Sequence, residues 1–358
     1  MKILALDIGA GTQDVLLYDD RINIENCIKI VLPSPSKVFA EKVKEITSKG
    51  KSLLVKGETI GGGVLTASIL NHLRRGFKVI MTKDAAYTIR NRLEDVEAYG
   101  IKIVKDEAEL ENFDGEILEL REIMINLLAE FLEKFNVKVL DVDFVAVGVQ
   151  DSGVYPKGVE NRRFRLQKMK EILEKNPKIE SLAFKEEEIP EFFLRMKSAV
   201  KAVKKQLSNV KVLVMDTAPA AILGCLTDSK VKDAREALII NAGNAHTLFS
   251  LILDGEVAGM VEHHTKMLNS ERLSWLLKEF LSGKLLDKHV FSDGGHGLFY
   301  LENFKPKPVE KIMIAITGPN RTIFSNTDFK VYFPAPGGDV MMTGTFGLVE
   351  AVKRKFFA

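Results

Sequence analysis

Two similar segments, about half the chain apart, carry residues suited to binding a phosphorylated ligand. When Leu4–Thr12 is aligned with Leu238–His246, Asp7 falls opposite Asn241 and Gly9 falls opposite Gly243. Glycine lets backbone N–H groups approach an anion closely, and a carboxylate at a strand end can hold a hydrated Mg²⁺. Two facing turns of this kind predict a shared phosphate cleft. Two unrelated hairpins with ordinary glycines are the alternative.

The expected roles follow from this arrangement. We expect Asp7 to hold Mg²⁺ through water and the two turns to bind phosphate groups. Later glycines would flank a nucleoside, and His246 would act in catalysis. The residues predicted to contact the nucleotide are Gly9, Gly11, Thr12, Gly243, Asn244, Gly318 and Gly338.

The histidines form a second candidate site. Five of the six fall in the C-terminal part, namely His246, His263, His264, His289 and His296. Imidazole is a common ligand for zinc and other transition metals, so His246, His263, His264 and His296 are predicted metal ligands. Adjacent residues of an extended chain point to opposite sides, so at most one of His263 and His264 should face the cleft. Phosphate binding, acid–base catalysis and a purely structural role stay open.

Three further positions could bind or activate a substrate. Asp151 follows an apolar strand and could act as a general base, or it could cap a helix or turn. Gly62 and Gly63 precede a predicted helix, whose N-terminus attracts anions, although a close-packed turn is equally compatible. Arg162 could bind a substrate anion in a bidentate fork, or it could belong to a solvated face.

The elements around these residues predict an α/β protein. Short apolar strands alternate with amphipathic helices between Ser52 and Val104, which favours a parallel sheet with helical crossovers. A long amphipathic helix is predicted over Leu118–Lys134. The chain is expected to divide into residues 1–236, with the first phosphate loop and an α/β insertion, and residues 237–358, with the second loop and the histidines.

The motif order resembles that of the actin, Hsp70 and sugar-kinase superfamily. Asp7–Thr12 resembles its first phosphate loop, Asn241–Thr247 its second, Ile312–Gly318 the strand under adenosine, and Gly344–Ala351 the closing helix. The resemblance implies a duplicated, two-lobed ribonuclease H-like fold with a central cleft that binds Mg²⁺ with ATP or ADP. The superfamily usually has Asp where this chain has Asn241, so binding without hydrolysis is an alternative.

The sequence is also similar to a prokaryotic domain of unknown function labelled "putative pyruvate formate-lyase activating enzyme". The phrases that carry this likeness are Ile60–Gly63, Gln150–Asp151, Asn161–Phe164, Met215–Thr217, Glu262–Thr265, Gly295–Gly297 and Pro334–Gly347. Activases of that kind are radical enzymes with a three-cysteine iron–sulfur motif. The only cysteines here are Cys27 and Cys225, far apart in the sequence, and they cannot hold such a cluster.

Composition indicates the size class of the protein, its partners and its location. A chain of 358 residues with 46% hydrophobic residues can form two lobes. The net charge of +2 makes no case for nucleic acid or an acidic membrane. No apolar run has membrane-spanning length, and the two cysteines form no disulfide framework, so a soluble cytoplasmic protein is expected. Abundant Lys and Glu with sparse Gln indicate a heat-adapted, thermophile source.

The first hypothesis is therefore an ATP-binding phosphotransferase or ATPase that acts on an unknown small molecule. A metal-dependent enzyme using the histidines and a non-catalytic nucleotide sensor are the alternatives. A homo-oligomer is compatible with the sequence.

Overall fold

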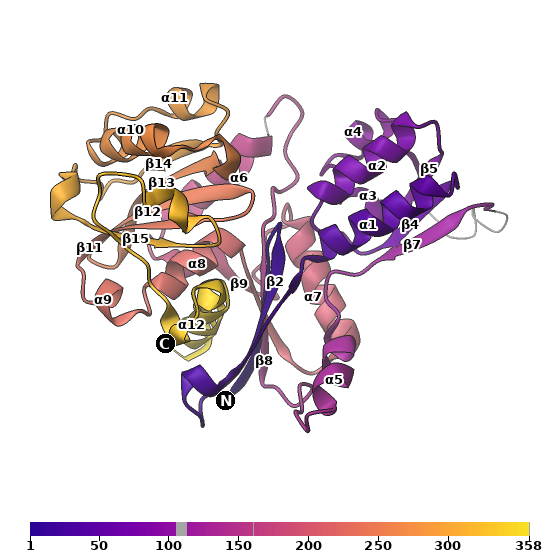
Figure 1. Cartoon of the computed structure of the whole chain (residues 1–358), viewed down its shortest axis with the longest axis horizontal. Helices are drawn as coiled ribbons and strands as arrows, with labels where there is room; N and C mark the ends of the chain where they lie inside the picture. Colours follow the sequence, from indigo (N-terminus) through magenta and orange to yellow (C-terminus); the bar gives the residue numbers. More distant parts are fainter. Residues whose placement is uncertain (105–112, 160, 358) are drawn as a thin grey trace.

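Two six-stranded mixed sheets form the two lobes of the protein. The computed structural model describes residues 1–104, 113–159 and 161–357, and the side chains of residues 161 and 162 are not described. The first sheet has the order β3-β2-β1-β8-β10-β9, and the second has the order β14-β13-β12-β11-β15-β16. Figure 1 shows the two lobes with the termini close to the junction between them.

The first sheet is built on the predicted N-terminal hairpin. Its strands are β1 (Lys2–Ile8), β2 (Thr12–Asp19), β3 (Ile28–Pro33), β8 (Phe144–Val149), β9 (Ala183–Lys185) and β10 (Lys211–Met215). Strands β1, β2 and β3 are antiparallel, whereas β8 is parallel to both β1 and β10. Every residue of β8 is buried, as expected for a strand covered on both faces.

The second sheet repeats this pattern. Its strands are β11 (Glu236–Ala242), β12 (His246–Leu253), β13 (Glu256–His264), β14 (Gly297–Tyr300), β15 (Met313–Thr317) and β16 (Val331–Tyr332). The hairpin β11–β12 is antiparallel, and β15 then adds parallel to β11, as β8 adds parallel to β1. The predicted duplicated, two-lobed α/β fold is confirmed.

A smaller parallel sheet forms an insertion in the first lobe. It has the order β6-β5-β4-β7, with β4 at Leu53–Gly57, β5 at Val79–Thr82, β6 at Lys102–Val104 and β7 at Glu116–Leu120. Its helices are α1 (Pro35–Ser48), α2 (Val64–Arg74), α3 (Lys83–Ala86) and α4 (Leu93–Glu97). These elements enclose a hydrophobic core of their own, and Figure 1 shows them projecting from the first sheet.

The predicted long helix over Leu118–Lys134 was wrong. The segment begins with the end of strand β7, and the helix α5 occupies only Ile125–Glu133. In β7, the side chains of Leu118 and Leu120 are buried while Ile117 and Glu119 are exposed, which is the period of a strand. The spacing of the leucines is compatible with the period of a strand and with that of a helix, so the sequence pattern did not distinguish a strand from a helix here.

Two helices lie between the sheets and share one core with both. They are α8 (Thr217–Cys225) and α12 (Thr343–Phe357), seen side by side at the centre of Figure 1. A Cβ atom at Gly224 would overlap the carbonyl oxygen of Thr343, and one at Gly347 would overlap that of Ala220. Glycine at both positions therefore lets the helix backbones touch. Helix α12 also contacts β1 and β8, so the division at residues 236 and 237 stays a prediction.

The other helices pack around the two sheets, and one of them contributes Leu166, Met169 and Leu173 to the core between the sheets. They are α5, α6 (Asn161–Leu173), α7 (Leu194–Gln206), α9 (Ser229–Lys232), α10 (Ser270–Leu281) and α11 (Asp287–Ser292). Within the parts of the chain that the structure describes, no helix combines the length and the apolar character that crossing a membrane requires.

Candidate functional site

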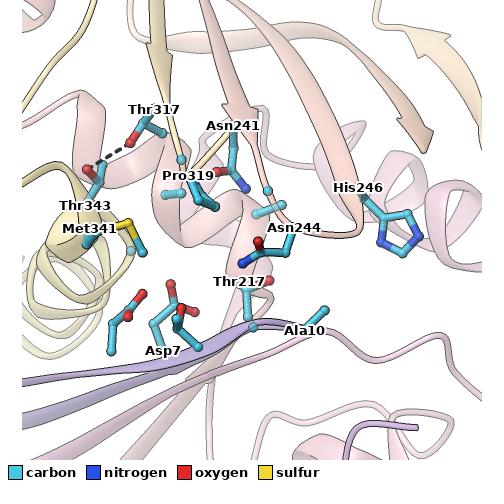
Figure 2. Close-up of a pocket in the computed structure, with 18 of the residues that line it drawn as sticks. Asp7, Ala10, Thr217, Asn241, Asn244, His246, Thr317, Pro319, Met341 and Thr343 are labelled. Atoms are coloured by element: carbon cyan, nitrogen blue, oxygen red, sulfur yellow. Dashed lines mark hydrogen bonds between the residues drawn. The ribbon is translucent and has the colours of Figure 1, made fainter. Parts of the chain in front are cut away.

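The two predicted phosphate turns face one cleft between the lobes. In the first turn, the N–H of Gly9 donates to the Thr12 carbonyl at 2.9 Å; in the second, the N–H of Gly243 donates to the His246 carbonyl at 3.0 Å. The same hydrogen bond thus closes both turns, which extends the sequence repeat to local geometry. Asp7, Thr12, Asn244, Gly318 and other residues line the cleft, and Figure 2 shows Asp7 and Asn244 approaching it from opposite lobes.

Two carboxylates beside the first turn each have one buried oxygen without a hydrogen-bond partner among the described residues. Asp7 is the residue before the last in β1, and Asp14 is its directly opposite neighbour on β2. The Oδ1 atom of each is buried and accepts no hydrogen bond from any residue that the structure describes. Burial, together with the charges of Asp14 and Asp216, raises the pKa of Asp7 well above its ordinary value. Burial raises the pKa of Asp14 to about 7. Such an unneutralised pair fits a cation.

This pair predicts an unusual pH dependence of stability. Between pH 3.8, the ordinary pKa, and about pH 7, the native protein binds more protons at Asp14 than the unfolded chain does. The free energy of unfolding should therefore fall as the pH rises through this range. Replacing Asp14 by Asn should flatten the fall and stabilise the ligand-free protein at neutral pH by up to about 4 kcal/mol. Denaturant unfolding at several pH values measures both effects.

The control for this prediction is Asp141→Asn. The Asp141 side chain is 79% exposed, so this change should leave the pH dependence as it is. Equal curves for the Asp14 variant and the original protein would contradict the prediction.

The cleft is nearly closed in this structure. Its volume is about 90 Å³, whereas ligand pockets usually measure roughly 300–1,000 Å³. The Asn244 side chain lies against Gly11, where a Cβ atom would overlap its amide. Gly318 has φ +96° and packs on the Ala242 carbonyl. The two turns therefore touch one another, and a nucleotide could enter only after the lobes move apart.

The structure leaves several predicted site residues outside this cleft. Asp151 is buried, and its oxygens accept from the N–H groups of Gly153 at 2.8 Å and Met196 at 3.1 Å, so it anchors a loop and the start of α7. Gly62 packs on the Thr88 carbonyl in the insertion, and Gly63 precedes α2 with φ +49°. Gly338 is not among the lining residues, although Met341 is. The side chain of Arg162 lies outside the described residues.

A buried arginine next to the cleft was missed by the sequence analysis. Arg165 on α6 is 1% exposed. Its guanidinium forms a bidentate pair with Asp216, at 2.8 and 2.7 Å, and contacts both oxygens of Glu262 at 2.7 and 2.6 Å. Asp216 caps α8 after the first sheet, whereas Glu262 lies on β13 of the second. This Arg165 bridge therefore joins the two lobes through fully desolvated charges.

The bridge also fixes the charge of Glu262. Burial alone would raise the pKa of this carboxyl, but the charge of Arg165 and the contact with His296 outweigh it and hold the pKa well below its usual range. Glu262 is therefore ionised beside the histidines.

The predicted histidine cluster is only partly assembled. His246, His264 and His296 each place a ring nitrogen within 4.8 Å of the others. His263 is excluded, because its Nε2 pairs with Asp293 at 3.1 Å on the other face of β13. Burial lowers the pKa of His246 to about 3, so its ring is neutral at neutral pH and brings no positive charge to a phosphate.

The sequence matches the family described as "Putative pyruvate format-lyase activating enzyme (DUF1786)" over residues 60–323. The chain belongs to this family. The match covers the insertion from Ile60 onward, α6 with the Arg165 bridge, and the histidine cluster, whereas the first turn with Asp7 and Asp14 lies outside it. The sequence matches no curated protein.

The activity in the DUF1786 description does not fit the cysteines of this member. Cys27 and Cys225 are both free and buried, and both belong to the hydrophobic core between the sheets. Burial raises the pKa of the Cys225 thiol, which disfavours the thiolate that iron binding needs. These residues therefore do not fit an iron–sulfur cluster.

Several solved structures are similar to the DUF1786 member at low sequence identity. A ROK hexokinase from Thermus thermophilus is 12% identical, with a TM-score of 0.24; the match covers 72% of this chain but only 47% of the hexokinase. The ethanolamine utilization protein EutJ from Carboxydothermus hydrogenoformans is 8% identical, with a TM-score of 0.34 and coverage of 97% and 89%. A protein described as "a putative N-acetylmannosamine kinase" from Listeria monocytogenes is 12% identical, with a TM-score of 0.37 and coverage of 99% of both chains. Likeness at this level defines no shared activity.

Proposed function

We propose that the protein binds a magnesium nucleoside di- or triphosphate in the cleft between its two glycine turns and uses it as a phosphotransferase or ATPase. The observation that carries this proposal is the pair of buried, unpartnered carboxylate oxygens on Asp7 and Asp14, placed beside the first turn. A hydrated Mg²⁺, which takes few protein ligands, would satisfy both.

Each part of the cleft then has a distinct task. Asp7 and Asp14 hold the cation, which offsets the negative charge of the phosphates. The N–H groups of Gly9 and Gly243 are used within their turns, so phosphate oxygens would bind the remaining backbone amides of the turns at Gly9–Thr12 and Gly243–His246. The segment from Thr317 to Pro319 and the residue Met341 line the cleft beyond the turns, where a nucleoside would lie. Catalysis would come from positioning and charge stabilisation.

Two residues limit the roles assigned in this proposal. Asn241 occupies the position equivalent to Asp7 and contributes no charge, so the cation is held from one lobe only. Asp151 is not included as a general base, because backbone N–H groups already bind both of its oxygens.

Thermal unfolding with nucleotides tests this function. Mg-ADP at about a hundred times its dissociation constant should stabilise the protein by roughly 2.7 kcal/mol. ADP with a chelator, or Mg²⁺ alone, should give a much smaller shift. Phosphate release from Mg-ATP then separates turnover from binding. Equal curves with and without Mg-ADP and Mg-ATP would overturn the proposal.

A further inference from the structure

We propose that His246, His264 and His296 form a binding site for one divalent transition metal of the zinc class, at the edge of the Mg-nucleotide cleft that His246 also lines. The ligand atoms of these three side chains lie within 4.8 Å of one another. The ring centroids are 4.6 to 4.9 Å apart in each pair.

Strand pairing fixes the three histidines in place. His246 begins β12 and His264 ends β13, and the two are directly opposite in the antiparallel ladder. His296 immediately precedes β14, which pairs with β13 on its other side. The N–H of His296 donates to the Glu262 carbonyl at 2.9 Å. Three neighbouring strands of one sheet therefore present the three rings, and such a scaffold preorganises a metal site.

Two outer groups prepare the rings for a metal. The Glu262 Oε2 atom lies 2.9 Å from Nδ1 of His296, close although outside hydrogen-bond geometry. The Gln150 amide oxygen lies 3.1 Å from Nδ1 of His246. An amide oxygen only accepts, so Nδ1 of His246 carries the proton and Nε2 offers its lone pair. Metal-binding histidines commonly donate Nδ1–H to a carboxylate or carbonyl oxygen, as His246 does here to Gln150.

A buried nitrogen without a partner points to the missing ligand. His296 is 7% exposed, and its Nε2 has no hydrogen-bond partner among the residues that the structure describes. A buried polar atom in this condition costs free energy unless something binds it. A metal ion held by the three rings would satisfy the atom.

The donor set selects the metal. Three imidazole nitrogens suit Zn²⁺ and its borderline neighbours, whereas Mg²⁺ prefers oxygen ligands. Three protein ligands leave one tetrahedral position for water or an oxygen of a substrate, as in catalytic zinc sites. His246 lines the cleft, but Figure 2 shows its ring pointing away from Asp7, so the three nitrogens would hold a cation other than the one at Asp7 and Asp14. Gln150 follows β8 of the first lobe, so metal binding would also be sensitive to the position of that lobe.

Metal titration of the full-length protein tests the site. After chelator treatment, Zn²⁺ should bind at one equivalent per chain, and Co²⁺ should give the intense visible bands of four-coordinate cobalt. His264→Ala and His296→Ala should each abolish stoichiometric Zn²⁺ binding. The matched control is His289→Ala, since this histidine lies on α11 away from the cluster. Gln150→Ala should weaken binding by about 10–100-fold.

The outcomes separate this site from the nucleotide site. Loss of Zn²⁺ binding in folded His264→Ala and His296→Ala variants, with Mg-ADP stabilisation kept, supports the proposal. If these variants do not fold, the Co²⁺ spectrum of the unaltered protein decides the question. Weak six-coordinate bands, absence of stoichiometric Zn²⁺, or undiminished binding in the folded variants would each overturn it, whatever the nucleotide result.

Discussion

Replacing Arg165 by Met is expected to lower the free energy of unfolding by about 3–5 kcal/mol. The methionine would fill most of the volume, but it would leave the carboxylates of Asp216 and Glu262 buried and unneutralised. A buried charge without a partner is among the most destabilising features in a protein interior. Denaturant unfolding at neutral pH measures the change.

The neighbouring Arg163 provides a matched control on the same helix. Its side chain is 45% exposed and pairs with Asp287 at 3.2 Å, so Arg163→Met should change stability by about 1 kcal/mol or less. Arg165→Lys should fall between the two, because lysine keeps the charge but cannot form the bidentate fork. A loss for Arg165→Met no larger than that for Arg163→Met would contradict the interpretation of the bridge.

The second large effect is expected at Asp7. Asp7→Asn keeps the shape of the side chain but removes the charge that would hold the cation. Mg-ADP should then no longer stabilise the protein. The ligand-free variant should unfold at a higher temperature, because a buried unpaired carboxylate has been removed. Opposite effects on binding and on stability are typical of a functional residue held at the expense of stability.

Asp151→Asn is the control for this experiment. Asp151 is 2% exposed, and its oxygens accept backbone N–H groups outside the cleft. The amide would weaken those hydrogen bonds and lower stability while leaving Mg-ADP binding intact. Retained nucleotide binding in Asp7→Asn, or loss of binding in folded Asp151→Asn, would contradict the roles assigned to the two residues.

The duplicated fold could be predicted because its signals are local. In the sequence, an apolar strand, a glycine turn and a second strand predict each hairpin. In the structure, the same hydrogen bond closes both turns, at Gly9 and at Gly243. Strands β4, β5 and β6 of the parallel insertion could also be predicted from the alternation of strands and helices, whereas β7 could not. The short strands β9 and β14 were missed, since three or four residues carry too little periodic signal.

The site was only partly predictable because its contacts are long-range. Arg165 stands in a charge-rich helix that reads as a solvated face, and its partners are 51 and 97 residues away. Asp14 reads as an ordinary polar strand residue until its register opposite Asp7 is known. The alternation rule correctly separated His263 from His264, but only the pairing of β12 with β13 shows which of the two joins His246.

The close crossing of α8 and α12 limits how the cleft can open. At one end of α8, Asp216 is tied through Arg165 to the second sheet; toward the other end, Gly224 and Ala220 touch the backbone of α12. A rigid movement that keeps two fixed points is a rotation about the line through them. The rotation axis would therefore run along helix α8. Rotation about this axis would move the two phosphate turns apart while the core beside α8 stays packed.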